Sequence, residues 1–207
     1  MHLVLERVVA QIASEVQELD ADTAQLHPGG RTHKWTVQQV IEHLVLSYRL
    51  TGSGLQTRLN KGRLARNHRR TYLQWSLQLM ILSFGNLAQG VPALEETIPV
   101  PGSFAAMNGR QLGAFLRQEA EAMDTLLDGC RRKFGMERVA THPWLGALRV
   151  DQWRRFHVIH GLHHVAQLRS VIDQVAPAPL PVKMTGRSLV KELRINGSLL
   201  KSRTREI

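Results

Sequence analysis

The chain has 207 residues, of which 43% are hydrophobic and 21% charged, so it can bury a core and is not an intrinsically disordered chain. Its net charge of +10 has two readings: a solvated surface, or a surface that contacts nucleic acid, phosphate or an anionic membrane. A single cysteine, Cys130, excludes an internal disulfide, and the N-terminus, with Glu6 and Glu15, lacks a signal-peptide pattern. The most apolar run, Leu77–Phe84, is too short to span a bilayer. We therefore expect a cytoplasmic protein without a membrane partner.

Two helices are expected in the first part of the chain. Apolar residues at helical spacing predict a helix over Leu5–Leu19, and the sequence 27–30 (HPGG) breaks it. Thr36 is a plausible N-cap for a second helix, whose apolar stripe runs through Val37–Tyr48. This pattern loosens at residues 51–54 (TGSG), and the sequence leaves open whether the helix continues.

Three further segments read as helical. Residues 71–87 are apolar nearly all round, which predicts a buried helix rather than a strand. An amphipathic helix is expected over Gly109–Phe134, with Gly135 as its stop. Residues 142–146 (HPWLG) suggest a turn-rich connector, after which Asp151 is expected to cap a last helix that reaches Ile172.

The order of these elements predicts an all-α fold. No stretch shows a convincing period-two alternation bounded by turn residues, so we expect a four-helix bundle with an extra helical insertion. Domain 1–176 would be this bundle, and residues 177–207 would be a basic C-terminal extension. The positive charge is concentrated in this extension and in the run 58–70. Both segments suit a solvated surface, and nucleic-acid, phosphate or membrane contact is the alternative.

The last predicted helix carries a face rich in histidine. Because an α-helix turns by about 100° per residue, His157, His160, His164 and Gln167 share one face, with His163 at its edge. The i, i+4 spacing of His160 and His164 allows two imidazoles to bind one metal ion. Two ligands rarely suffice, so a third has to come from another helix. The alternative is that these are core histidines satisfied by hydrogen bonds.

Two groups of motifs in this sequence resemble those of the DinB-like superfamily of bacterial four-helix metalloproteins. The first is WTVQQVIEHL at residues 35–44, and the second combines HPWLG at 142–146 with Gln152-Trp153, the His160-x3-His164 pair and Gln167-Leu168. The resemblance implies that His43 joins His160 and His164 around one divalent ion, namely Zn, Ni, Fe or Mn. It also implies an open coordination position, the pattern of catalytic rather than structural zinc sites.

The resemblance further implies a metal-dependent enzyme that acts on a small-molecule substrate, with thiol transfer or hydrolase-like chemistry. A low-molecular-weight thiol is the second cofactor that it suggests, and a homodimer is the assembly. His157 and Gln167 would hydrogen-bond the ligand imidazoles from behind. Packing roles are the alternative for both, and His157 could also replace one of the ligands. Glu42, adjacent to His43, is expected to be solvated. No catalytic residue is assigned.

Two other functions stay open from the sequence. In the first, the metal only ties helices together and the protein is a non-catalytic metal-binding or interaction protein. In the second, the basic segments bind nucleic acid. This second function is less favoured, because the sequence has no recognisable helix-turn-helix or zinc-finger spacing and the tail lacks interleaved aromatic residues.

Overall fold

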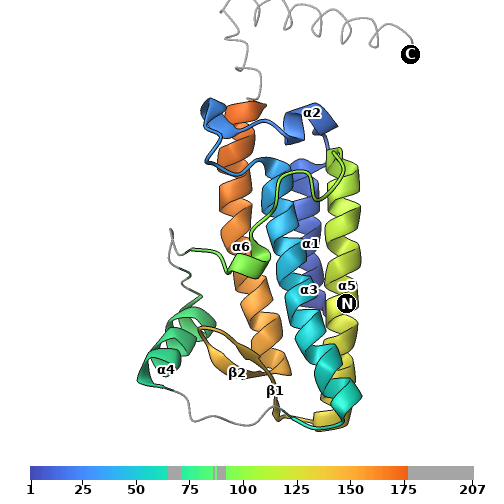
Figure 1. Cartoon of the computed structure of the whole chain (residues 1–207), viewed down its shortest axis with the longest axis vertical. Helices are drawn as coiled ribbons and strands as arrows, with labels where there is room; N and C mark the ends of the chain where they lie inside the picture. The colour runs from blue at the N-terminus through green and yellow to red at the C-terminus, as the bar shows by residue number, and fades with distance from the viewer. Residues whose placement is uncertain (65–70, 86, 88–91, 177–207) are drawn as a thin grey trace, which may run out of the picture. The chain divides into compact units, whose positions relative to one another are not determined.

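The computed structural model of this chain describes residues 1–64, 71–85, 87 and 92–176. The predicted extension 177–207 and residues 65–70 of the basic run lie outside the described part, so the domain boundary after residue 176 stays a prediction. The described part is mostly helical (Figure 1). None of its helices is both long and apolar enough to cross a membrane.

Four long helices supply the core of the described part. They are α1, α3, α5 and α6, which span Leu3–Val16, Val37–Lys61, Gly109–Phe134 and Val150–Val175. Helix α5 packs against α1 and α3, and α6 packs against the same two helices (Figure 1). Their facing sides are lined mainly by Leu, Val and Ile, as the amphipathic patterns predicted. Helix formation in these segments therefore follows from burying one apolar stripe per helix.

The ends of α3 and α5 follow from their caps. Thr36 accepts a hydrogen bond from the backbone N–H of Gln39, whose side chain bonds back to Thr36, so the predicted N-cap is confirmed. Helix α3 continues past Gly52, where Leu126 of α5 lies 3.4 Å from the position of a Cβ, an ordinary contact distance. Gly135 ends α5 with φ of 61°, as predicted.

A short β-hairpin corrects the all-α prediction. Strands β1 (Arg138–His142) and β2 (Gly146–Arg149) pair antiparallel, with His142 opposite Gly146. Gly146 adopts φ of 69°, which a side chain would strain, at the end of the turn. The strands are too short to show alternation, so the sequence was read only as a connector. Because β2 runs directly into α6, Arg149 occupies the N-cap position, and the predicted Asp151 cap is wrong.

The insertion between α3 and α5 is not the buried helix that was predicted. Helix α4 (Tyr72–Gln78) is followed by a π-helical turn, η2 (Leu79–Ser83). Tyr72 and Phe84 are 94% and 75% exposed, whereas Ile81 and Leu82 are buried. Within the described part of the chain, the segment contacts the hairpin through Gln78 and α6 through η2, and its exposed apolar side chains include Tyr72, Leu73, Trp75 and Phe84. Apolar composition alone therefore led to the wrong prediction that this segment is buried.

Three shorter elements complete the described part. They are the helix α2 and two 3₁₀ turns, η1 and η3, which span Ala21–Ala24, Pro28–Gly30 and Glu95–Thr97. The turn η1 packs against α6, and η3 packs against α3. The position of η3 matters most, because it brings backbone oxygen atoms to a histidine of α3.

Candidate metal centre

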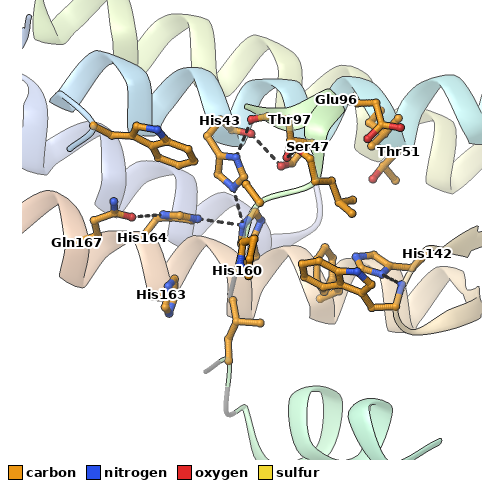
Figure 2. Close-up of a pocket in the computed structure, with 18 of the residues that line it drawn as sticks. His43, Ser47, Thr51, Glu96, Thr97, His142, His160, His163, His164 and Gln167 are labelled. Carbon is orange, nitrogen blue, oxygen red and sulfur yellow. Dashed lines mark hydrogen bonds between the residues drawn. The ribbon is translucent and has the colours of Figure 1, made fainter. Parts of the chain in front are cut away.

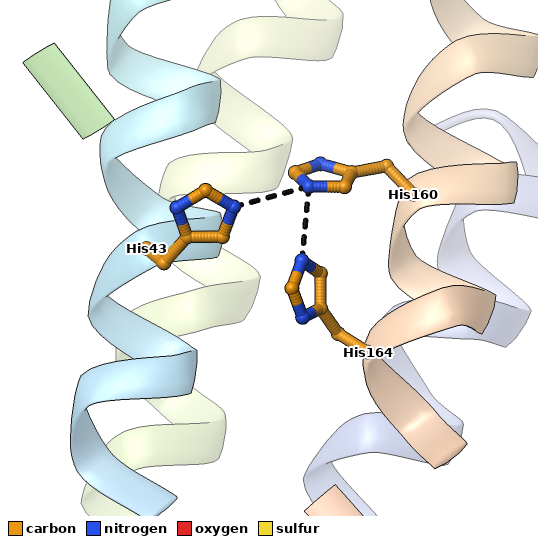
Figure 3. Close-up of side chains that lie close together, drawn as sticks. All are labelled: His43, His160 and His164. Carbon is orange, nitrogen blue, oxygen red and sulfur yellow. Dashed lines mark hydrogen bonds between the residues drawn. The ribbon is translucent and has the colours of Figure 1, made fainter. Parts of the chain in front are cut away.

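Three histidines from two helices meet between α3 and α6. His43 lies on α3, and His160 and His164 lie one turn apart on α6 (Figure 3). The Nε2 atom of His160 is 3.1 Å from Nε2 of His43 and 3.0 Å from Nε2 of His164. Potential ligand atoms of the three residues all lie within 4.8 Å of one another, and all three side chains are buried. We call this group the His triad.

Two of these imidazoles are oriented by hydrogen bonds on their outer nitrogen. Nδ1 of His43 lies 2.8 Å from the carbonyl oxygen of Thr97, and Nδ1 of His164 lies 2.8 Å from Oε1 of Gln167 (Figure 2). Because both partners are acceptors, each Nδ1 carries the proton and donates it. The Nε2 atoms of both rings therefore present lone pairs to the centre of the triad, as in metal-binding histidines.

His160 completes the triad, and protein atoms alone do not satisfy it. Its Nδ1 is buried and has no hydrogen-bond partner within the described part of the chain. If Nδ1 carries the proton, three lone pairs face one another at the centre. If Nε2 carries it, one N–H can be directed at only one of the two lone pairs it faces. A cation at the centre would accept all three lone pairs at once, so the donor set fits a divalent ion.

Burial keeps the triad neutral. The pKa values of His43 and His160 are lowered from the usual 6.5, chiefly because burial disfavours the charged imidazolium, and that of His160 falls well below it. The pKa of His164 is lowered to about 3 for the same reason, with a further contribution from His43. Neutral imidazole is the form that binds metals, and it suits Zn, Ni, Fe or Cu.

The triad lies on the wall of a large cavity. The cavity has a volume of about 1070 Å³ and is lined by residues of α3, α6, the hairpin and η2, by Leu87 and by the segments 28–35 and 92–97. Ser47 and Thr51 of α3 continue its wall beyond His43 (Figure 2). Among its described lining residues, Glu96 is the one carboxylate and Lys34 the one lysine or arginine. Because the three histidines line this cavity, an ion that they held would have a coordination position facing it.

The other residues singled out in the sequence have separate positions. Gln167 contacts His164, as expected of a residue that orients a ligand. His157 is fully buried and bonds the hydroxyl of Thr51 at 3.1 Å, and it has no described hydrogen bond to the triad. Its position matches the packing alternative. Glu42 is buried and accepts a hydrogen bond from Gln38, so the expectation that it is solvated is wrong.

Burial and hydrogen bonding act in opposite directions on Glu42. Burial raises the pKa of its carboxyl group, and the hydrogen bond from Gln38 partly offsets this. Gln38 also donates to the carbonyl oxygen of Ala105 and accepts from the backbone N–H of Met107. This network ties α3 to the segment before α5. Glu42 does not line the cavity with the triad, so we assign it no part in the site.

Sequence reasoning missed two contributors to the site. The carbonyl oxygen of Thr97 orients His43, and no residue type signals a backbone contact of this kind. His142 was read only as part of a connector, yet it is buried and lines the cavity. Conversely, Arg58 and Lys61 of the basic run do not line the described cavity, and residues 65–70 lie outside the described part. The described residues of this run, 58–64, thus show no contact with the triad.

One comparison with known proteins gives a match, and it corrects the resemblance drawn from the motifs. A family model described as "Protein of unknown function (DUF1569)" matches residues 7–171. No curated protein and no solved structure matches the chain. DUF1569 is a distinct family, so the expected DinB-like membership is wrong. The inclusion of His43 in the triad therefore depends on the observed geometry and not on a family. By the extent of this match, the chain belongs to the DUF1569 family.

Proposed function

We propose that the chain binds one divalent metal ion through His43, His160 and His164 and uses it as an enzyme that activates a nucleophile. The observation that carries the proposal is the convergence of three buried Nε2 atoms on a cavity wall, with two of the rings held by outer hydrogen bonds. A bound ion of this kind supplies Lewis acidity and lowers the pKa of a coordinated water or thiol.

The scaffold for this site is proposed to be a four-helix bundle formed by α1, α3, α5 and α6. In such bundles, metal sites are built from side chains that project inward from facing helices. The contacts of α3 and α6 and the inward position of the triad support this assignment. The helix pair would set the distance between His43 and the other two ligands.

The residues around the triad would orient it and bind substrate. Thr97 and Gln167 hold two imidazoles in the tautomer that presents Nε2 to an ion. The Ser47 hydroxyl donates to the backbone carbonyl oxygen of His43 at 2.8 Å, so no described general base accepts its proton in this arrangement. We therefore favour hydrolysis or group transfer by a metal-activated nucleophile. Thiol transfer was implied by the resemblance alone and stays a prediction, as do the thiol cofactor, the homodimer and the cytoplasmic location.

The direct test is the metal content of the purified protein. Elemental analysis of wild type should find near-stoichiometric Zn, Ni, Fe or Mn, and His160→Ala should lose it. His163→Ala is the matched control, because His163 lies on the same helix beside His164 but outside the triad. If wild type contains no metal and neither Zn²⁺ nor Ni²⁺ binds on addition, the metal site is wrong.

The cavity favours an enzyme over a protein in which the metal only ties helices together. Cobalt-substituted protein distinguishes the two functions without knowledge of the substrate. An open coordination position would let azide bind and change the visible absorption spectrum of the Co²⁺ centre. A spectrum that azide leaves unchanged would indicate a closed, structural ion and would contradict the catalytic proposal. Screening of amide, ester and thiol substrates would follow the first outcome.

A further inference from the structure

The cavity extends well beyond the triad, and its far end has a distinct chemistry. Figure 2 shows His142 at the opposite end from His43, His160 and His164, with Thr51 and Glu96 nearby on the facing wall. His142 ends strand β1, and the residues around it include Trp144, Trp153 and Phe156. We call these four residues, His142 and the three aromatic residues, the ring subsite.

The turn of the hairpin determines which nitrogen of His142 carries its proton. Nδ1 lies 3.2 Å from the backbone nitrogen of Trp144 and 3.3 Å from that of Leu145. Both backbone groups are N–H donors, so Nδ1 has to be an unprotonated acceptor. In the neutral ring, the proton is therefore on Nε2. Burial lowers the pKa of His142 to about 4, which keeps the ring neutral at physiological pH.

The resulting Nε2–H group has no acceptor among the described residues, although the His142 side chain is only 5% exposed. Nε2 is not itself fully buried, so water or a ligand in the cavity can accept from it. Three aromatic rings pack around the His142 imidazole. The centroids of Phe156, Trp153 and Trp144 lie 4.6, 5.7 and 6.2 Å from that of His142. Trp153 and Phe156 each stack one face on a histidine of α6, at 5.9 Å on His157 and 5.5 Å on His160. Their remaining surfaces and the 37% exposed Trp144 line this end of the cavity beside the fixed donor.

We propose that the ring subsite binds a flat ring that bears a hydrogen-bond acceptor, such as an aryl carbonyl group, with the Nε2–H of His142 donating to that acceptor. The aromatic walls would contact the faces of the ring. Because the subsite and the triad share one cavity, the proposal deepens the proposed function. It implies an elongated substrate whose reacting group lies at the triad and whose ring lies at His142.

A single substitution separates the role of His142 in the turn from its role as a donor. In His142→Asn, the side-chain oxygen can take the place of Nδ1 and accept from Trp144 and Leu145, but nothing replaces Nε2–H. Thermal unfolding of this variant should therefore resemble that of wild type. Trp144→Ala is the complementary variant, because it removes an aromatic wall and leaves the donor in place.

Benzamide and toluene are the probes, since they share a ring and differ in the acceptor. Binding to the full chain is followed by ¹H–¹⁵N NMR, with the indole N–H groups as reporters. The proposal expects His142→Asn to weaken benzamide binding about three- to tenfold and to leave toluene binding unchanged. It expects Trp144→Ala to weaken binding of both probes. Equal binding of benzamide to wild type and His142→Asn, or no binding to wild type, would overturn it.

The titrations are made both with EDTA and with Zn²⁺, which keeps this test separate from that of the metal site. Benzamide binding in EDTA that depends on His142 would support the subsite even if His160→Ala showed that no metal binds. If zinc binds and the affinity for benzamide does not depend on His142, the ring subsite is wrong and the metal site is unaffected. In that case the Nε2–H group would be directed at the face of Phe156, the nearest ring.

Discussion

Replacing His160 by leucine should reverse the order of stability between the metal-free and the zinc-loaded protein. Leucine fills much of the volume of the imidazole, so little cavity is left. The change removes the buried Nδ1 that lacks a partner and the Nε2 atom that faces two others. Without metal, His160→Leu should therefore be more stable than wild type. With metal, wild type alone should gain stability from the complete triad.

The structure sets the expected size of both effects. A buried polar atom without a hydrogen bond costs about 1–3 kcal/mol, so the leucine variant should gain about 1–2 kcal/mol in free energy of unfolding in the presence of a chelator. Zinc at one hundred times its Kd should stabilise wild type by about 2.7 kcal/mol. Because the second effect exceeds the first, adding zinc should make wild type the more stable protein.

Urea unfolding followed by circular dichroism, once in EDTA and once with excess Zn²⁺, measures both free energies. His163→Leu is the control, since His163 neighbours His164 without belonging to the triad, and it should keep the gain from zinc. The reasoning would be refuted if zinc stabilised His160→Leu as much as wild type. It would also be refuted if the leucine variant were the less stable protein in EDTA.

Three further predictions follow from named contacts. Gly109→Ala should destabilise the fold by at least about 2 kcal/mol in urea unfolding, because the added Cβ would lie 1.7 Å from a backbone oxygen of α1. Gly54→Ala is the control: its Cβ would meet open space within α3, so it should stabilise the fold by up to about 1 kcal/mol. Gln167→Leu should weaken zinc binding about 10- to 100-fold in chelator competition by removing the acceptor for His164, and Gln167→Glu should retain it. Because the pKa of His142 is lowered to about 4, the unfolded chain binds a proton between pH 6.5 and 4 that the folded chain does not. Stability should therefore fall as pH drops through this window, and His142→Asn should reduce the slope by about 1.4 kcal/mol per pH unit, whereas an unchanged slope would contradict the burial of a neutral ring.

Local features of the chain were predictable where neighbours in sequence decide them. The apolar stripes placed the four long helices, Thr36 was identified as a cap, and Gly135 was identified as a stop. These features depend on residues within one or two helical turns. The same holds for the pairing of His160 with His164, because i, i+4 spacing puts both rings on one side of α6 whatever surrounds it.

Features that depend on partners distant in sequence were predicted wrongly or left open. The segment containing Tyr72 and Phe84 reads as core from its composition, yet both of these side chains are exposed, because its described contacts with the hairpin and α6 involve Gln78 and η2. The hairpin was not recognised, since each strand is stabilised by the other and not by its own pattern. Likewise, Glu42 is buried, and its partner Gln38 also bonds Ala105 in the distant segment before α5.

The same distinction between local and distant partners applies to the candidate site. By itself the sequence determined that two histidines of the last helix face the same way, with Gln167 beside them. Only the tertiary structure decided that His43 meets them, because that contact depends on how α3 and α6 pack across more than a hundred residues of chain. It also decided that a backbone carbonyl of η3 orients His43 and that His142 lines the same cavity. Helical periodicity acts over a few residues, whereas a cavity is formed by surfaces that meet only when the core closes.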